Sequence, residues 1–270
     1  MFVSYAQNFE DVMLERVFGS QTNGFYIDVG AWHPETYSVT KHFYEKGWSG
    51  INIEPSKSYY EILTKRRSRD INLNVAIGTC VGSRDFIEVP ESGLSSLGRD
   101  AIARAEQHDL SSRCYKIPVL TLQSVCEQYC CGKPLSFLKI DVEGCERDVI
   151  ASLDWRIHRP VVVLVEAVHP DTGLPAWDTW ECILLDAGYN FVWFDGLNRY
   201  YLKSECEDLK KHFLVPPGFA DGFVLESSNP LCMKLGMKLA LASRRILPPT
   251  VRKLLVRVYG LSKGMALRGA

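Results

Sequence analysis

The feature that most constrains the fold is an alternation of apolar runs of strand length with stretches of helical length. The run PVVVLVEA at 160–167 is apolar almost throughout, which is typical of a strand buried on both faces of a parallel sheet. Parallel strands need crossover connections, and the intervening stretches have the pattern of helices. The predicted strands are 24–30, 49–55, 71–78, 136–144 and 160–167, and the predicted helices are 38–47, 56–69, 121–130 and 146–154.

Because such crossovers are right-handed, a doubly wound α/β sheet is the leading topology. The pattern changes near its end, where residues 180–189 predict a helix and residues 190–202 predict a hairpin. Asp195-Gly196 is a strong turn signal, because both central positions of such a turn need a positive φ. We therefore predict a Rossmann-like, mostly parallel sheet with an antiparallel terminal hairpin.

A change of charge divides the chain near residue 230. The whole chain has a net charge of −1, yet no acidic residue follows Glu226, and residues 230–270 carry nine lysines and arginines. We predict one domain over 1–229 and a basic amphipathic helical tail over 230–270. Basic residues interleaved with apolar ones suit a helix on an anionic membrane surface. Packing against the domain, or against a second subunit of a homo-oligomer, is the open alternative.

Composition excludes several classes of protein. A chain of 270 residues with 46% hydrophobic and 23% charged residues is typical of a folded domain. Balanced charge argues against a nucleic-acid partner. The nine scattered cysteines include no CxxC pair, which indicates reduced thiols and disfavours structural zinc. With no visible signal peptide or membrane-length apolar stretch, we expect a cytoplasmic protein, peripheral at the inner membrane face if the tail binds lipid.

Acidic residues stand where four of the predicted strands end. Asp28, Glu54 and Glu166 lie at the ends of their strands, and Asp141 and Glu143 lie at the end of the strand 136–144. In an open parallel sheet, ligands bind at the carboxyl ends of the strands, so these carboxylates should converge on one edge. Each would lose solvation there unless a ligand or the backbone donates hydrogen bonds to it. Capping of the following helix is the alternative role for Asp28 and Glu143.

The spacing of two of these acids suggests a cofactor that carries a ribose. Glu54 lies 26 residues after Asp28, where nucleotide-binding folds place the acid that binds ribose hydroxyls, and Gly30 allows close approach of the backbone. No G-x-G-x-x-G fingerprint follows the first strand, and no phosphate loop is present, which disfavours NAD, FAD and nucleoside triphosphates. A ribose site without a pyrophosphate site suits S-adenosyl-L-methionine (SAM).

Several longer motifs then carry a family resemblance. They are YAQNFEDVML, GFYIDVGA, FYEKGWSGINIEP, GLSSL, PVLTL, FLKIDVEGCE and RPVVVLVE. Together they resemble the FkbM family of SAM-dependent methyltransferases over residues 5–225. The resemblance implies a class I methyltransferase fold with seven strands, the last of them antiparallel. It also implies SAM as methyl donor and O-methylation of hydroxyls, often on sugars or natural products.

The resemblance also implies roles for individual residues. It places Asp28, Gly30 and Ala31 in the first SAM motif, and it makes Glu54, with Pro55 beside it, the ribose-binding acid. Ala6 stands where the family commonly has Ser. Because alanine has no hydroxyl, any role of the serine hydroxyl is not assigned to this position. The remaining predicted contacts are Asn74 and Ala76 near the adenine, Asp141 and Glu143 near the methyl group, and Gln7 and Asp11 over the cofactor.

Methyl transfer to an alcohol benefits from a general base, because the hydroxyl loses its proton as the new bond forms. Asp141 is our first choice for this base or for a metal ligand, followed by Glu143 and Glu166. His169 and His33 are further candidates, since histidine titrates near neutral pH. Asp141, Glu143 and Glu166 could together hold a divalent cation, although the spacing does not require one. The aromatic residues that could stack on a sugar are Trp32, Tyr37, Trp48 and Trp193.

The favoured interpretation is a SAM-dependent O-methyltransferase that acts on a sugar hydroxyl of a glycan, a glycolipid intermediate or a small glycoside. Residues 84–112 are expected to form loops that shape the choice of acceptor. The alternative is a non-catalytic SAM-binding scaffold or regulator of glycan biosynthesis, and a dehydrogenase is disfavoured by the missing glycine fingerprint.

Overall fold

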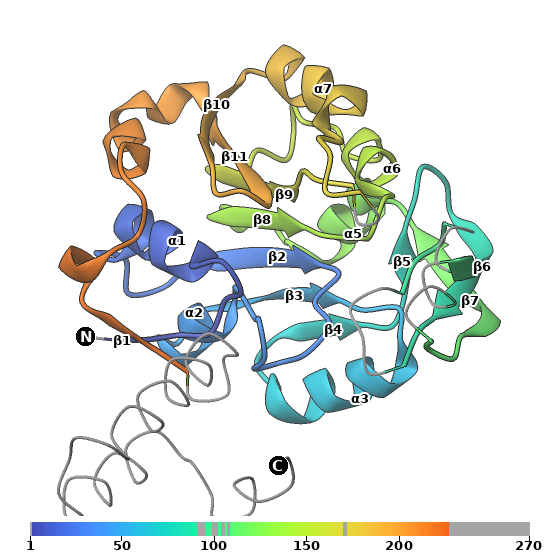
Figure 1. Cartoon of the computed structure of the whole chain (residues 1–270). Helices are drawn as coiled ribbons and strands as arrows, with labels where there is room; N and C mark the ends of the chain where they lie inside the picture. The colour runs from blue at the N-terminus through green and yellow to red at the C-terminus, as the bar shows by residue number, and fades with distance from the viewer. Residues whose placement is uncertain are drawn as a thin grey trace, which may run out of the picture.

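The central element of the computed structural model is a seven-stranded sheet (Figure 1). The structure describes residues 2–90, 95–98, 102–103, 106, 109–169 and 172–226. The strands run in the order β10-β11-β9-β8-β2-β3-β4. Their bounds are Tyr189–Phe194, Asn198–Lys203, Val162–Glu166, Phe137–Ile140, Phe25–Val29, Ser49–Ile53 and Ile71–Leu73.

The sheet is parallel from β4 through β9, and the hairpin of β10 and β11 joins it next to β9. β11 is antiparallel to both of its neighbours. The predicted α/β character and the hairpin are therefore confirmed, but three residues, 195–197, connect β10 to β11, and of the predicted turn pair only Gly196 has a positive φ (98°). The remaining helices have the bounds α1 Glu10–Phe18, α2 Lys41–Glu45, α3 Lys57–Arg66, α5 Leu122–Tyr129, α6 Glu146–Ala151 and α7 Glu181–Asp186.

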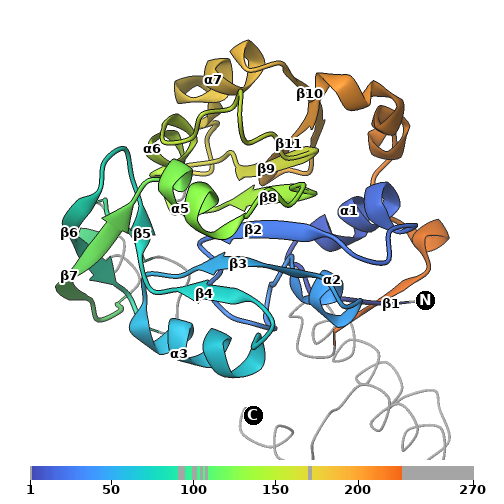
Figure 2. The same ribbon diagram turned by 180° about the vertical axis from the view of Figure 1, so that it is seen from behind.

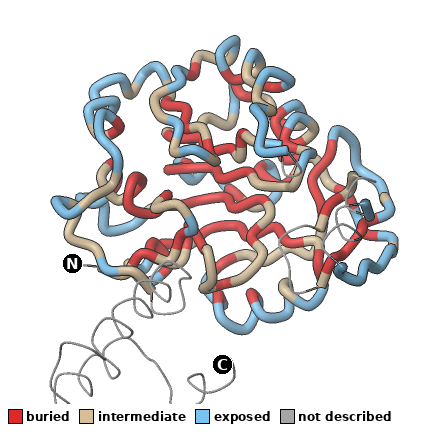
Figure 3. The backbone as a smooth tube through the Cα atoms, viewed as in Figure 1, coloured by how far each residue is buried: buried red, intermediate tan, exposed pale blue. Residues whose placement is uncertain are grey.

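Two apolar cores cover the two faces of the sheet, because alternate residues of each strand point to opposite sides. Ile27 and Val29 of β2 belong to a core completed by α5, α6 and α7. Tyr26 of β2 belongs to the other core, which α1, α2 and Phe213 complete. Figure 3 shows the resulting buried strands within a more exposed shell, and Figure 2 shows α5 and α6 from behind.

The predicted strand at 71–78 is divided in the structure. β4 ends at Leu73, and the next strand, β5 (Ala76–Ile77), belongs to a separate three-stranded sheet. Asn74 lies at the break, where its side-chain amide donates to the carbonyls of Glu54 (3.0 Å) and Pro55 (2.8 Å). A polar side chain thus ties the end of β3 to the point where the chain leaves the main sheet.

The remaining elements were not predicted. β6 (Gly82–Glu88) pairs with β7 (Arg113–Leu120), so the loop expected to begin at Arg84 begins instead after β6. β1 (Phe2–Ser4) pairs with β12 (Phe223–Leu225), and the described residues also include three 3-10 segments. Those segments are η1 Trp177–Thr179, η2 Ser204–Phe213 and η3 Phe219–Asp221. The predicted basic tail over 230–270 lies outside the described residues.

A buried guanidinium fixes the loop that follows β2. Arg67, at the end of α3, donates through Nη2 to the carbonyl oxygen of Pro34 (2.7 Å) and to Ser38 Oγ (2.7 Å). Its Nη1 lies 3.8 Å from Asp70 Oδ2, and both side chains are almost fully buried. A buried cation needs these partners to offset its lost hydration.

Replacing Arg67 with methionine should therefore destabilise the chain, because Asp70 would remain buried and charged with its cation removed. We expect the free energy of unfolding in urea to fall by about 3 kcal/mol. The matched control is Arg66→Met at the exposed neighbouring position, which should change it by less than about 0.5 kcal/mol. Equal effects of the two substitutions would contradict this account.

Candidate functional site

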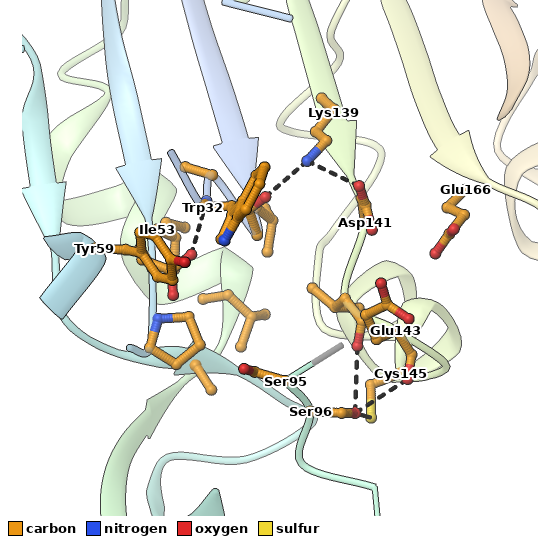
Figure 4. Close-up of a pocket in the computed structure, with 18 of the residues that line it drawn as sticks. Trp32, Ile53, Tyr59, Ser95, Ser96, Lys139, Asp141, Glu143, Cys145 and Glu166 are labelled. Atoms are coloured by element: carbon orange, nitrogen blue, oxygen red, sulfur yellow. Dashed lines mark hydrogen bonds and ion pairs between the residues drawn. The ribbon is translucent and has the colours of Figure 1, made fainter. Parts of the chain in front are cut away.

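A cavity of about 310 Å³ lies at the carboxyl ends of the parallel strands (Figure 4). The acids that end β3 and β9, Glu54 and Glu166, line it, as do Asp141 and Glu143 after β8. The strand-end prediction is therefore confirmed for these four residues. The other polar, aromatic and glycine residues of the lining are Gln7, Glu10, Gly30, Trp32, Tyr37, Tyr59, Ser95, Ser96, Lys139, Cys145 and Asn198.

A buried lysine organises one end of the cavity. Lys139 Nζ donates to the carbonyl oxygen of Gly30 (2.7 Å) and lies 3.3 Å from both Asp28 Oδ1 and Asp141 Oδ2. Burial by itself lowers the pKa of Lys139, but the charges of Asp141 and Asp28 outweigh it, so the net shift is upward and the side chain is cationic. The lysine thus joins β2 to β8.

Asp28 does not line the cavity, contrary to the prediction of a cofactor contact. Its place in β2 puts it on the same side of the sheet as Tyr26, so its carboxylate faces the start of α2, where Thr40 Oγ1 donates to it (3.1 Å). Asp28 acts on the site through Lys139.

Gly30 is required by close packing of two backbone segments. Its φ is +76°, and an added Cβ would lie 1.8 Å from the carbonyl oxygen of Asp141. Ala31 is buried beside it, and both residues line the cavity. The turn after β2 is therefore in contact with the turn after β8.

Glu54 is fixed by backbone donors at the end of β3. The amide of Trp32 donates to Oε2 (2.8 Å) and the amide of Ser56 donates to Oε1 (2.7 Å). Burial raises the pKa of Glu54 to about 7, despite these donors and the charge of Lys139, which favour the ionised form. Each carboxyl oxygen keeps a lone pair for another donor.

Of the residues predicted to contact the cofactor beside Glu54, two line the cavity and one lies outside the lining. Pro55 and Ala76 line the cavity, together with the apolar side chains of Val75, Ile77 and Phe86. Asn74, predicted to lie near the adenine, is absent from the lining, and its side-chain amide donates to the Glu54 and Pro55 carbonyl oxygens.

Aromatic rings form the wall beside Glu54. Trp32 stacks on Tyr37, with ring centroids 5.9 Å apart, and lies 5.6 Å from the ring of Tyr59 (Figure 4). Of the four aromatic residues considered for sugar stacking, Trp32 and Tyr37 line the cavity. Trp48 is buried in the core beneath α1 and the partly buried Trp193 packs against that core, and neither lines the cavity.

Three non-glycine residues of the cavity wall have a left-handed backbone: Trp32 (φ 46°), Tyr37 (φ 57°) and Glu143 (φ 56°). This conformation costs energy for residues with a Cβ, and it persists where the surroundings hold it. Ser96 contributes here, because its Oγ donates to the Glu143 carbonyl oxygen (3.1 Å).

Three carboxyl groups meet on the side of the cavity opposite Trp32 (Figure 4). One oxygen from each of Asp141, Glu143 and Glu166 lies within 4.8 Å of the others. Burial, followed by the charges of Asp141 and Glu143, raises the pKa of Glu166 to about 11. Oxygen donors at this separation could hold a hard divalent cation.

The N-terminal segment also reaches the cavity. Gln7 lines it as predicted, whereas Asp11 is buried behind it and accepts hydrogen bonds from Ser4 Oγ and the Tyr5 amide, both at 2.7 Å. Asp11 therefore shapes the segment that carries Gln7 and does not contact the cavity.

Both histidines considered as bases lie away from the lining. Nδ1 of His33 accepts hydrogen bonds from the backbone amides of Glu35 (3.2 Å) and Thr36 (2.9 Å), and burial lowers the pKa of His33. His169 borders a second cavity instead. Neither prediction of a base in the first cavity is supported.

Several lining residues were not predicted as functional. Glu10 is buried, and its Oε1 accepts a hydrogen bond from Nδ2 of Asn198 (2.9 Å). Lys139, Ser95 and Ser96 lie within the motifs FLKIDVEG and GLSSL, so the sequence contained a signal for them. Glu10 lies within the motif YAQNFEDVML, although its partner is 188 residues away and the motif gave no sign of this contact.

Comparison with known families then identifies the chain. The model of the methyltransferase FkbM domain matches residues 28–191, more than half of the sequence. The chain belongs to the FkbM methyltransferase family. This match includes most of the cavity lining, while Gln7, Glu10 and Asn198 lie beyond its ends. A comparison with curated proteins found no match.

None of the helices in the described ranges has the length and apolar character needed to cross a lipid bilayer.

A buried acid near the cavity gives this FkbM-family protein a pH-dependent stability. Burial, then the charge of Asp195, raises the pKa of Glu10 to about 8 from a usual 4.5. Between these values the unfolded chain ionises Glu10 first, so stability is greatest at low pH and falls as pH rises through the folded pKa.

We expect the free energy of unfolding to fall between pH 5 and pH 8, and Glu10→Gln to reduce that fall by on the order of a few kcal/mol. Chemical denaturation at several pH values measures it. The control is Glu61→Gln on the exposed surface of α3, which should keep the pH dependence of the unsubstituted chain. A pH dependence unaffected by Glu10→Gln would count against the assignment.

Proposed function

We propose that the chain is a SAM-dependent O-methyltransferase with the class I arrangement, acting on a sugar hydroxyl of a glycan, a glycolipid intermediate or a small glycoside. The observation that carries the cofactor proposal is the charge of the cavity. Five carboxyl groups line it, from Glu10, Glu54, Asp141, Glu143 and Glu166, whereas the single cationic side chain among the described lining residues is Lys139.

That cation is already paired with Asp28 and Asp141. A cofactor with a diphosphate would therefore meet carboxyl groups where it needs donors and positive charge. A cofactor with a positively charged sulfur meets the opposite situation, because the carboxylates of Asp141 and Glu143 favour its binding, while Glu10 and Glu166, whose pKa values burial raises, add polar groups and not charge at neutral pH. The order of the strands, with the antiparallel β11 between β9 and β10, is consistent with the class I arrangement.

The residues present fit the parts of SAM. Glu54 has lone pairs left for the two ribose hydroxyls, and its position is set by the Trp32 and Ser56 amides. The apolar side chains of Ile53, Ala76, Ile77 and Phe86 suit the adenine ring. When bound, SAM supplies a methyl group attached to a sulfonium.

Asp141 is the residue placed to accept the acceptor's proton. Its side chain is 37% exposed, so a hydroxyl can reach it, and the ion pair with Lys139 fixes one of its oxygens. As the oxygen–methyl bond forms and the sulfur–methyl bond breaks, the hydroxyl proton would pass to Asp141. Glu166, protonated at neutral pH because of its raised pKa, would donate a hydrogen bond nearby.

The same three carboxyl groups also fit a divalent cation, as expected from the sequence. Asp141, Glu143 and Glu166 would then be its ligands, and the cation would acidify the acceptor hydroxyl and orient it. A chelator distinguishes the two arrangements: activity lost with EDTA and restored by Mg²⁺ supports the cation.

Glu54→Gln should weaken binding of S-adenosylhomocysteine, because an amide cannot accept hydrogen bonds on both of its ends. We expect a Kd about tenfold higher by isothermal titration calorimetry, which corresponds to about 1.4 kcal/mol. The control Glu61→Gln should bind as the unsubstituted chain does. Stabilisation by NAD and not by S-adenosylhomocysteine would reject the cofactor proposal.

Asp141→Asn should slow methyl transfer more than it weakens cofactor binding, because it removes the proton acceptor. With labelled SAM and a panel of methyl glycosides, we expect a rate lower by about 10²–10⁴-fold. The control Asp186→Asn, at an exposed position of α7, should leave the rate unchanged. Binding of S-adenosylhomocysteine without transfer to any acceptor would favour the scaffold alternative.

A further inference from the structure

A second cavity, of about 270 Å³, adjoins the first. Glu143 lines both, so this residue separates the candidate methyl-transfer site from the second space. Its position is fixed by the Ser96 hydroxyl, which donates to its carbonyl oxygen at 3.1 Å. Asp141 lines the first cavity, two residues before this shared residue.

The chemistry of the second cavity differs from that of the first. Its lining is of mixed character: a guanidinium (Arg147), an imidazole (His169), a hydroxyl (Thr179) and three carboxyl groups, those of Glu143, Glu146 and Asp178. The buried ring of Trp180 contributes an aromatic wall. Hydrogen-bonding groups of both kinds beside an aromatic surface suit a ligand with many hydroxyls and apolar ring faces.

Backbone hydrogen bonds hold the walls of this cavity in place. The His169 amide donates to the Leu174 carbonyl oxygen (2.7 Å), and the Ala176 amide donates to that of Ala167 (2.9 Å). Across the cavity, Arg147 Nε donates to the Thr179 carbonyl oxygen (3.2 Å), which connects α6 to η1. The space is therefore preformed, which lowers the entropic cost of binding a ligand there.

We infer that the second cavity binds the body of the acceptor, a neutral polyhydroxylated sugar, and that its reacting hydroxyl reaches past Glu143 into the first cavity. This inference rests on the proposed function and adds to it the place where the acceptor binds. With three carboxyl groups beside the single guanidinium of Arg147, the lining favours a neutral ligand over an anionic one.

Filling the cavity with a large side chain tests the inference. Thr179→Trp places an indole at an exposed position of the lining, and Thr64→Trp is the matched control. Thr64 is an exposed threonine on α3 whose hydroxyl donates to the Tyr60 carbonyl oxygen (2.9 Å), as that of Thr179 donates to Ala176 (3.1 Å). The full chain is assayed with labelled SAM and methyl glycosides of gluco, galacto, manno and rhamno configuration, and S-adenosylhomocysteine binding is measured on the same samples.

We expect at least one glycoside to be methylated, with kcat/KM lowered tenfold or more by Thr179→Trp and unchanged by Thr64→Trp. The Kd of S-adenosylhomocysteine should stay within twofold for both variants. Unchanged kcat/KM in Thr179→Trp would overturn the location. If the chain binds S-adenosylhomocysteine but methylates no glycoside, the sugar class is overturned while the cofactor proposal stands. If it neither binds S-adenosylhomocysteine nor methylates a glycoside, the proposed function is rejected as well.

Discussion

The geometry of the site depends on the ammonium group of Lys139. It lies between the carboxylates of Asp28 and Asp141 and donates to the Gly30 carbonyl oxygen, so one cation joins the ends of two neighbouring strands. Removing it would leave two carboxylates together in a largely buried place, which is among the most destabilising changes a protein can undergo. Because two acids share one cation, the arrangement keeps surplus negative charge at the edge of the cavity.

The opposite wall is stabilised by different means. Arg67 holds the carbonyl oxygen of Pro34 and the hydroxyl of Ser38, on either side of the strained Tyr37. The ring of Tyr37 in turn supports Trp32, whose amide donates to Glu54. A buried charge at the end of α3 thus helps to fix the position of the acid proposed to bind ribose. This chain of contacts explains how a costly backbone conformation can persist in the wall.

Much of the fold and part of the site followed from local pattern. Unbroken apolar runs identified the parallel strands, and the rule that ligands bind at their carboxyl ends identified Glu54, Asp141, Glu143 and Glu166. Asp28 was misplaced because its position on a strand, two residues after Tyr26, sends it to the other face of the sheet. Glu10, Asn198 and the β1–β12 pairing depend on contacts between distant parts of the chain, which periodicity cannot reveal. Lys139 was overlooked because a lysine within an apolar strand is informative only when its partners are known.

The charge of the cavity also bears on how the proposed reaction would end. The carboxylates of Asp141 and Glu143 would attract a positively charged sulfur more strongly than the neutral thioether that remains after methyl transfer. The ribose and adenine contacts near Glu54 do not change with the transfer, so they would hold donor and product alike. Discrimination between donor and product would therefore fall on the acids after β8, which include the proposed proton acceptor Asp141. An acidic wall of this kind favours loading of the donor and release of the product at one site.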